Sequence, residues 1–256
     1  MIRAFNMRCD DPRRYSDWVD RGQKYFADTW PRSARGLEAF VQGGDISGDA
    51  LKKHWFSSAD THVFISHSHQ DRELALGLAG YLHSMELAPF VDSLVWGDSS
   101  KLLRGIDEKF CKSAQGENFD YQKRNYSTSH VHMMLASALT EMIDRTDAVI
   151  FLNTPNSIRA SSSSAPGDAV TASPWIYHEL VTTKIAREVG FKGRKLSQTR
   201  PLRTLREVTV EASMTILHKP PMDHLASLAP VDLDELKATG AKGLALLDKL
   251  YWRRRA

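Results

Sequence analysis

The sequence predicts an α/β protein in which a parallel sheet carries helices on both faces. Three short apolar runs have the β-branched and aromatic composition of buried strands, at residues 62–65, 88–92 and 148–152. Stretches with apolar residues at helical spacing separate these runs. Strands that alternate with helices in this way are typical of a parallel sheet wrapped on both sides.

An N-terminal segment, residues 1–58, precedes the first of these strands. It is rich in Arg, Asp and Trp, and its apolar positions are scattered: Trp18, Tyr25, Phe26, Trp30, Leu37 and Phe40. This pattern favours short helices packed as a cap. We therefore expect a helical N-terminal extension at 1–58 and the main domain at 59–256.

The first strand, His62–Ile65, ends in a polar loop that begins with Ser66, His67 and Ser68. A short apolar run of this kind suits an inner strand of a parallel sheet. Ligands of open α/β sheets bind at the carboxyl ends of the strands. We expect the loop to face a crevice, where backbone N–H groups of the following helix could meet a diphosphate or a ribose.

A helix is predicted to follow this loop. Ser68 and Asp71 match the Ser-x-x-acid capping pattern, which marks a helix start. Apolar residues then recur at helical spacing, at Leu74, Leu78, Leu82 and Met85.

The second predicted strand, Ala88–Asp92, leads into the loop Ser93–Ser100, which carries Trp96. A helix then presents an apolar face, made of Met133, Leu135, Ala138, Leu139, Met142 and Ile143. The run Ala148–Leu152 that follows is the clearest buried strand in the chain.

Two backbone signals mark the next helix, after the Ser-rich loop Ser161–Gly167. Ser173 is a favourable N-cap, and Pro174 suits the first helical position. Beyond residue 190 the pattern favours edge strands at 207–211 and 214–217. One or two helices are expected over 232–252.

Trp175 and Glu179 lie four residues apart on this helix and therefore on one face. A carboxylate beside a large aromatic ring is partly desolvated, which strengthens its interaction with a positive charge. Cleavage of an N-glycosidic bond to a cationic base creates such a charge, because the base leaves as a neutral molecule and the sugar becomes oxocarbenium-like. One carboxylate suffices for this in principle, unlike the two of ordinary glycosidases. The alternative is that Trp175 belongs to the core and Glu179 is a solvated helix residue.

Composition and charge are those of an ordinary globular protein. The 256 residues carry a formal net charge of +3, which gives no reason to expect a nucleic-acid partner. Arg253–Arg255 favours a solvated tail. Cys9 and Cys111 form no spaced cluster, which fits a reducing compartment. No apolar run has the length of a signal-peptide core or a membrane span, so we expect a cytoplasmic protein without a membrane partner.

Other kinds of site have weaker support in the sequence. His67 and His69 lack a third clustered ligand, so no metal site is expected. Ser66, His67 and Asp71 are not expected to form a hydrolase triad, because there is no Gly-x-Ser-x-Gly motif. Neither a Walker loop nor a Gly-x-Gly-x-x-Gly turn is present, so no redox cofactor is expected.

Three motifs resemble the bacterial members of the Toll/interleukin receptor (TIR) domain family. They are Val63-Phe-Ile-Ser-His-Ser-His-Gln-Asp71, Pro89-Phe-Val-Asp92 and Ser173-Pro-Trp-x-x-x-Glu-Leu180. The resemblance covers roughly residues 60–190 and implies a flavodoxin-like fold. Residues 98–130 look like an insertion relative to the compact family pattern. In enzymatic members a glutamate of the matching helix cleaves NAD, and Glu179 is the matching residue. The resemblance also implies a substrate pocket bordered by Ser66, His67, Ser68, Asp92, Trp96 and Trp175.

The activity implied by this resemblance is that of an NAD glycohydrolase or cyclase, with NAD as substrate and no cofactor. The products would be nicotinamide and ADP-ribose, or a cyclic or conjugated ADP-ribose. Such proteins commonly serve bacterial anti-phage defence, by draining NAD or by signalling to an effector. The loop Ser93–Ser100 matches a segment that contacts a neighbouring subunit, which implies a homo-oligomer. Two alternatives stay open: a non-catalytic TIR interaction module, and a nucleoside deoxyribosyltransferase-like enzyme with a similar sheet and a single glutamate.

Overall fold

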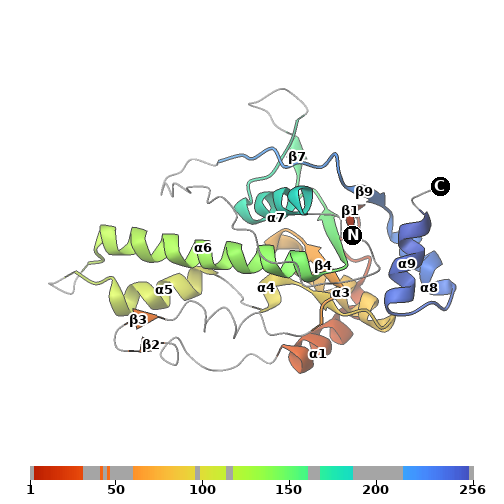
Figure 1. Ribbon diagram of the computed structural model, residues 1–256, viewed down its shortest axis with the longest axis horizontal. Coiled ribbons are helices and arrows are strands. Elements are labelled where there is room, and N and C mark those ends of the chain that lie inside the picture. The colour runs from red at the N-terminus through yellow and green to blue at the C-terminus, as the bar shows by residue number, and fades with distance from the viewer. Residues whose placement is uncertain are drawn as a thin grey trace.

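A five-stranded parallel sheet forms the centre of the computed structural model (Figure 1). The strands lie in the spatial order β5-β4-β6-β1-β9. The structure describes residues 3–30, 41–42, 45–46, 60–95, 99–113, 118–160, 168–186 and 216–253. The strands of the sheet are β1 (Arg3–Arg8), β4 (Val63–Ser66), β5 (Pro89–Phe90), β6 (Ala148–Asn153) and β9 (Ala226–Leu228). The predicted α/β class with a parallel sheet is confirmed, and the three predicted strands are β4, β5 and β6.

The first strand lies where no strand was predicted. Instead of belonging to a helical extension, β1 pairs with β6 on one side and with β9 on the other. Its apolar side chains Phe5 and Met7 are fully buried and alternate with Asn6 and Arg8. This period of two is a strand signal, so the prediction for residues 1–58 was wrong at its start.

The strand order places the N-terminus in an unusual position in the sheet. Counted from β4, the order β5-β4-β6 corresponds to the 2-1-3 half of the flavodoxin-like order 2-1-3-4-5. In that order the fourth place belongs to a strand that follows the third in sequence. Here the N-terminal strand β1 occupies it, so residues before the TIR-like motifs are part of the same sheet.

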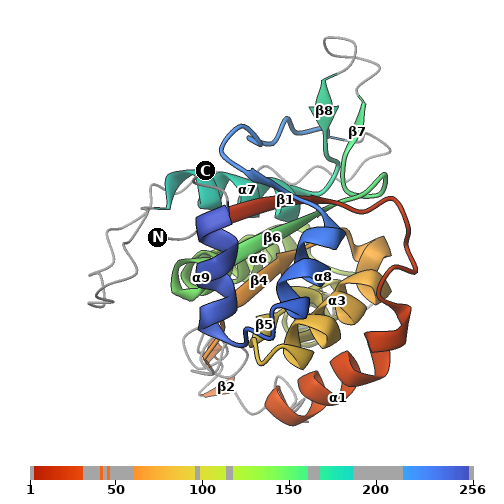
Figure 2. The ribbon, with the colours of Figure 1, turned by 90° about the vertical axis from the view of Figure 1, so that its right-hand side faces the viewer.

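Helices cover both faces of the sheet, as predicted. On one face lie α3 (Arg72–Ser84), α8 (Pro230–Ala238) and α9 (Leu244–Arg253), and on the other lie α6 (Tyr121–Arg145) and α7 (Pro174–Ile185) (Figures 1 and 2). The predicted helices after residues 68, 133 and 173, and the helices over 232–252, are therefore present. Leucines of α8 and α9 join the same buried core as the strands.

The helix α1 (Val19–Thr29) packs on the outer side of α3 (Figure 2). Two glycines, Gly22 of α1 and Gly80 of α3, make this contact close. A Cβ on Gly80 would lie 2.1 Å from the carbonyl oxygen of Trp18, and one on Gly22 would lie 2.2 Å from that of Leu76. Tyr25 and Phe26 of α1 belong to the main core. The predicted helical character of this part is confirmed, but α1 shares the core of the domain.

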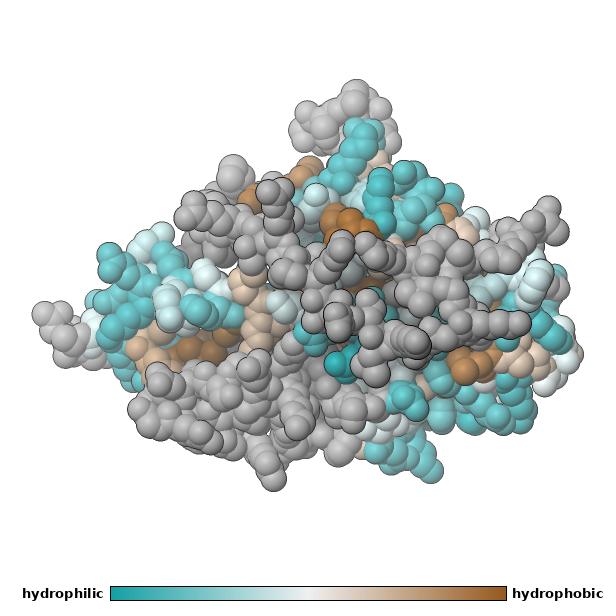
Figure 3. Space-filling model, in the orientation of Figure 1, coloured by the Kyte–Doolittle hydropathy of each residue, from teal (hydrophilic) through white to brown (hydrophobic). Residues whose placement is uncertain are grey.

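The insertion predicted at 98–130 is a helical hairpin as far as it is described. It consists of α5 (Ser99–Phe110) and the first half of α6, which lie side by side (Figure 1). Ile106, Val131 and Leu135 form a small apolar cluster between them. The surface over α5 is partly apolar, whereas the surface over α6 is mainly hydrophilic (Figure 3).

The remaining elements are short. They are η1 (Ser16–Trp18), β2 (Val41–Gln42), β3 (Asp45–Ile46), η3 (His69–Asp71), α4 (Asp92–Val95), β7 (Arg159–Ala160) and β8 (Ala169–Val170). The predicted loop 161–167, the strand 207–211 and residues 214–215 lie outside the described residues, and residues 216–217 are not in a strand. Within the described ranges, no helix has the length and apolar character needed to cross a membrane.

Candidate functional site

The carboxyl ends of β4 and β6 define the candidate site. These strands are neighbours, and Ser66 at the end of β4 is in register with Phe151 of β6. The chain leaves β4 through α3 toward β5 on one side, and leaves β6 toward β9 on the other. The gap between the two ends is therefore a topological switch point, where open α/β sheets bind their ligands.

The helix α7 brings Glu179 to this edge. Ser173 Oγ accepts a hydrogen bond from the backbone N–H of Ile176 at 3.2 Å, and Pro174 occupies the first turn, as predicted. Ile176 and Leu180 pack against Phe151 of β6. Since this apolar contact faces the sheet, the intervening Glu179 is carried inward with it.

Ser66 and Glu179 are hydrogen-bonded inside the protein. Ser66 Oγ donates to Glu179 Oε2 at 2.5 Å, and the residues are 0% and 2% exposed, respectively. Burial raises the pKa of the Glu179 carboxyl well above its usual range, and the nearby Asp92 raises it further. The Ser66 hydroxyl opposes this pKa shift. Because Glu179 is buried, it is not the solvated helix residue of the alternative interpretation.

Asp92 and His67 form an acid–base pair next to the Ser66–Glu179 contact. His67 Nδ1 lies 3.6 Å from Asp92 Oδ1, and His67 Nε2 shares a 2.9 Å hydrogen bond with Ser93 Oγ. Burial lowers the pKa of His67, while Asp92 opposes that shift. Burial raises the pKa of Asp92, and His67 is the main group that opposes this shift. Each group is thus driven toward its neutral form by loss of water.

Four of the predicted site residues therefore come together, namely Ser66, His67, Asp92 and Glu179. Ser68 is half-buried next to them, but its side chain caps no helix. Its carbonyl accepts a hydrogen bond from the backbone N–H of Asp71 at 2.8 Å. Trp96 lies outside the described residues.

Trp175 packs mainly against apolar core residues. The half-buried ring packs against the apolar cluster of Ile106, Val131 and Leu135 and against the main core. Its edge meets the ring of His132, with centroids 5.8 Å apart. Trp175 therefore joins the helical hairpin to α7, one turn before Glu179.

A network centred on Asp71 was not predicted. Its carboxylate, in a residue that is 5% exposed, accepts hydrogen bonds from Thr154 Oγ1 at 2.5 Å and from Asn156 Nδ2 at 2.7 Å. The capping role expected for this acid was wrong, because the loop after β6 occupies both carboxylate oxygens. The polar run after the strand at 148–152 was the available signal.

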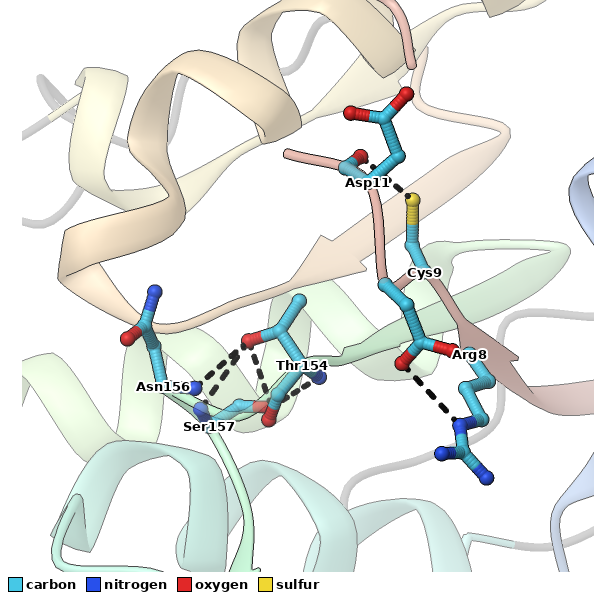
Figure 4. Close-up of polar contacts among 7 residues, drawn as sticks. Arg8, Cys9, Asp11, Thr154, Asn156 and Ser157 are labelled. Carbon is cyan, nitrogen blue, oxygen red and sulfur yellow. Dashed lines mark hydrogen bonds and ion pairs between the residues drawn. The ribbon is translucent and has the colours of Figure 1, made fainter. Parts of the chain in front are cut away.

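The turn after β6 is also held by its own hydrogen bonds. Thr154 Oγ1 accepts from the backbone N–H of Asn156 at 3.2 Å and from that of Ser157 at 3.3 Å (Figure 4). Ser157 Oγ donates to the carbonyl of Leu152 at 2.9 Å. Figure 4 also shows the end of β1, where the Cys9 thiol donates to the carbonyl of Asp11 at 3.4 Å. Together these bonds hold one wall of the switch point in place.

No metal site is evident in the described part of the chain, where no three His, Cys, Asp or Glu side chains are grouped to hold an ion. His69 is exposed in η3 and does not join His67 in a cluster. Cys9 and Cys111 are both buried free thiols.

Comparison with known proteins identifies no relative. No family model matches the chain, and neither a curated protein nor a solved structure matches it. The interpretation of the site therefore depends on its own chemistry.

Proposed function

We propose that the protein is a TIR-type enzyme that cleaves the nicotinamide–ribosyl bond of NAD, with Glu179 as its catalytic carboxylate. The observation that carries this proposal is the position of Glu179. It is a buried acid at the switch point of a parallel sheet, held by Ser66 at 2.5 Å. The motif resemblance at residues 63–71, 89–92 and 173–180 supports the same assignment.

The chemistry of the bond fits a single buried carboxylate. Nicotinamide leaves NAD as a neutral base, so its departure needs no proton. The ribosyl carbon becomes cationic, and an anion nearby in a site of low dielectric stabilises that charge strongly. Glu179 would supply the anion once the cationic substrate has favoured its ionised form.

Ser66 would orient Glu179 for this role. It engages Oε2, and no hydrogen bond to Oε1 is seen among the described residues. That second oxygen could accept a ribose hydroxyl while Ser66 keeps the side chain in place. Asp92 and His67 would form the neighbouring wall of the pocket.

The fate of the ribosyl group follows from what reaches the cation. Water gives ADP-ribose, an atom of the same molecule gives a cyclic isomer, and an outside nucleophile gives a conjugate. The hairpin of α5 and α6, which Trp175 joins to α7, motivates a covered site in which a cyclic or conjugated product accompanies ADP-ribose. A role in anti-phage defence, through NAD loss or a signal to an effector, remains part of this proposal.

An interaction module is the competing function, and the burial of Glu179 favours it. A side chain that is 2% exposed can serve a structural role through its bond to Ser66. A catalytic role requires that substrate reach the carboxylate by displacing groups that now surround it. Catalysis and assembly therefore predict different results with NAD.

The deciding experiment is incubation of the purified protein with NAD, followed by chromatography with mass detection. The proposal predicts release of nicotinamide together with ADP-ribose species by the wild type and loss of both with Glu179→Gln. Glu73→Gln, the same change at an exposed position on α3, is the matched control and should retain activity. No release by the wild type at any protein concentration would favour the interaction module. Transfer between deoxynucleosides and free bases would indicate the deoxyribosyltransferase alternative.

A further inference from the structure

Two acids, the buried Glu179 and the partly exposed Asp92, contact two consecutive residues at the end of β4. Ser66 contacts Glu179 at 2.5 Å, and the next residue, His67, lies 3.6 Å from Asp92. The Asp92 side chain is 14% exposed and the His67 side chain 1%. The two acids come from different elements, α7 and α4, and contact adjacent residues of the chain. Asp92 raises the pKa of Glu179.

The charged groups around this pair are acids and histidines. Glu179 faces Ser66 of β4 and Asp92 of α4. Asp92 faces His67 and, more weakly, His69 of η3. His67 in turn experiences Asp92, Asp71 and His69. Among the described residues, no lysine or arginine is one of the strongest neighbours of these three groups.

A second observation points to a ligand. His67 Nδ1 is a buried nitrogen without a hydrogen-bond partner within the described structure, and it is directed toward Asp92 at 3.6 Å. A buried polar atom without such a partner is costly. The Asp92–His67 contact is thus loose and can tighten or change when charge is added beside it.

We propose that Glu179 and Asp92 act as one pair that retains a proton before a ligand binds and releases it to solvent when a cationic ring binds. One positive charge enters and one leaves, so the net charge of the buried site does not change. In this arrangement Asp92 is a positioning residue, acting through Glu179, and His67 holds Asp92. This inference deepens the proposed function and rests on it for the identity of the cation, the pyridinium of NAD.

The pair implies a choice between ligands of the same shape. A pyridinium compensates the charge of the ionised Glu179, whereas the neutral ring of the reduced dinucleotide does not. Binding of the reduced form should therefore be weaker and should release no proton. In the variant Asp92→Asn, Glu179 loses the neighbour that favours its protonated form. Glu179 is then already ionised in a larger fraction of the molecules before the ligand binds.

Calorimetry in two buffers of different ionisation enthalpy counts the protons released. The probe is a carbocyclic NAD analogue, which keeps the pyridinium but has no cleavable glycosidic bond. The wild type should release close to one proton per analogue bound near neutral pH. Asp92→Asn should release clearly fewer, and its activity profile should extend to lower pH. Asp144→Asn, the same change at an exposed position on α6, should match the wild type.

The idea fails if the analogue binds the wild type without proton release, or if Asp92→Asn releases as many protons. If the analogue does not bind at all, the proposed function fails and the pair is tested separately. Infrared difference spectra between the wild type and Glu179→Gln at neutral pH report the protonated carboxyl directly. A protonated-carboxyl band that weakens in Asp92→Asn would support the pair without NAD. Absence of that band from the wild type would overturn it.

Discussion

Ser66 and Glu179, 113 positions apart in the chain, share a buried hydrogen bond of 2.5 Å at the carboxyl edge of the sheet. Apolar packing brings them together, because α7 docks on β6 through Phe151. The bond therefore depends on the topology of the sheet, with β4 and β6 as neighbours. An acid placed in this way is both a structural contact and a reactive group, and variants can separate the two roles.

Replacement of Glu179 by Gln should abolish NAD cleavage without unfolding the protein. The amide oxygen can still accept the hydrogen bond of Ser66, but the charge that stabilises the ribosyl cation is gone. Loss of one such electrostatic partner should lower the rate by about a hundredfold or more. The measurement is nicotinamide release, with circular dichroism as the test of folding. Wild-type activity in a folded variant would contradict the catalytic assignment.

The same variant should change how stability depends on pH. The pKa of Glu179 is raised in the folded protein, so the folded state holds more protons than the unfolded chain above the ordinary glutamate range. Stability from this group is fully present below that range and is lost as pH rises through the raised pKa. Glu179→Gln lacks this loss of stability. The melting temperature of the variant, compared with that of the wild type, should therefore be more favourable at alkaline pH than at acidic pH. A difference in melting temperature between variant and wild type that stays constant as pH rises above the ordinary glutamate range would contradict this.

Most elements of the fold were predictable because their patterns are local. The run at 148–152 and the apolar face at 133–143 identify themselves within a few residues. The strand β1 does not, because Arg3, Asn6 and Arg8 interrupt its apolar positions. Its place in the sheet comes from pairing with β6, about 145 residues away in register, and no local signal reports such a partner. The strand β9 is only three residues long and has no pattern at all.

The sequence predicted which residues belong to the site better than it predicted how their side chains contact one another. Both Ser66 and Glu179 stand at recognisable positions, a strand end and one face of a capped helix. The Asp92–His67 contact and the network around Asp71 depend on how loops fold at the sheet edge. The acid at residue 71 looked like a helix cap, and only the position of the loop after β6 shows what it binds.

The close packing of α1 on α3 gives a stability prediction. Gly80→Ala adds a methyl group where a Cβ would lie 2.1 Å from the carbonyl oxygen of Trp18, so the helices must move apart. Such overpacking should cost about 1–3 kcal/mol. Urea denaturation measures it, and Gly105→Ala, where a Cβ meets nothing within 4 Å, is the control. An alanine at residue 80 that leaves the midpoint unchanged would refute this helix contact.

Assembly is testable through the concentration dependence of activity. The proposed function implies that the segment 93–100 contacts a neighbouring subunit and completes the pocket. Specific activity should then rise with protein concentration, because dilution dissociates the subunits and leaves each pocket incomplete. Sizing chromatography over the same range should show a growing oligomer. Constant specific activity from a protein that remains a monomer would count against assembly.

The final prediction concerns Asp71, which joins the start of α3 to the loop after β6. Its buried carboxylate accepts from Thr154 at 2.5 Å and from Asn156 at 2.7 Å. In Asp71→Asn, one acceptor oxygen becomes an NH₂ group that faces a donor, so a buried pair is left unsatisfied. This should cost about 1–3 kcal/mol of stability, whereas the exposed Asp144→Asn should change it by less than about 0.5 kcal/mol.

A reciprocal exchange separates this pairing from a general loss of charge. Combining Asp71→Asn with Asn156→Asp reverses donor and acceptor across the same contact. The double variant should regain part of the lost stability, because residue 156 can now accept from residue 71. Coupling between the two changes in denaturant unfolding is the measured quantity. If the effects simply add, the carboxylate does not act through Asn156, and the edge of the switch point must be held by Thr154 instead.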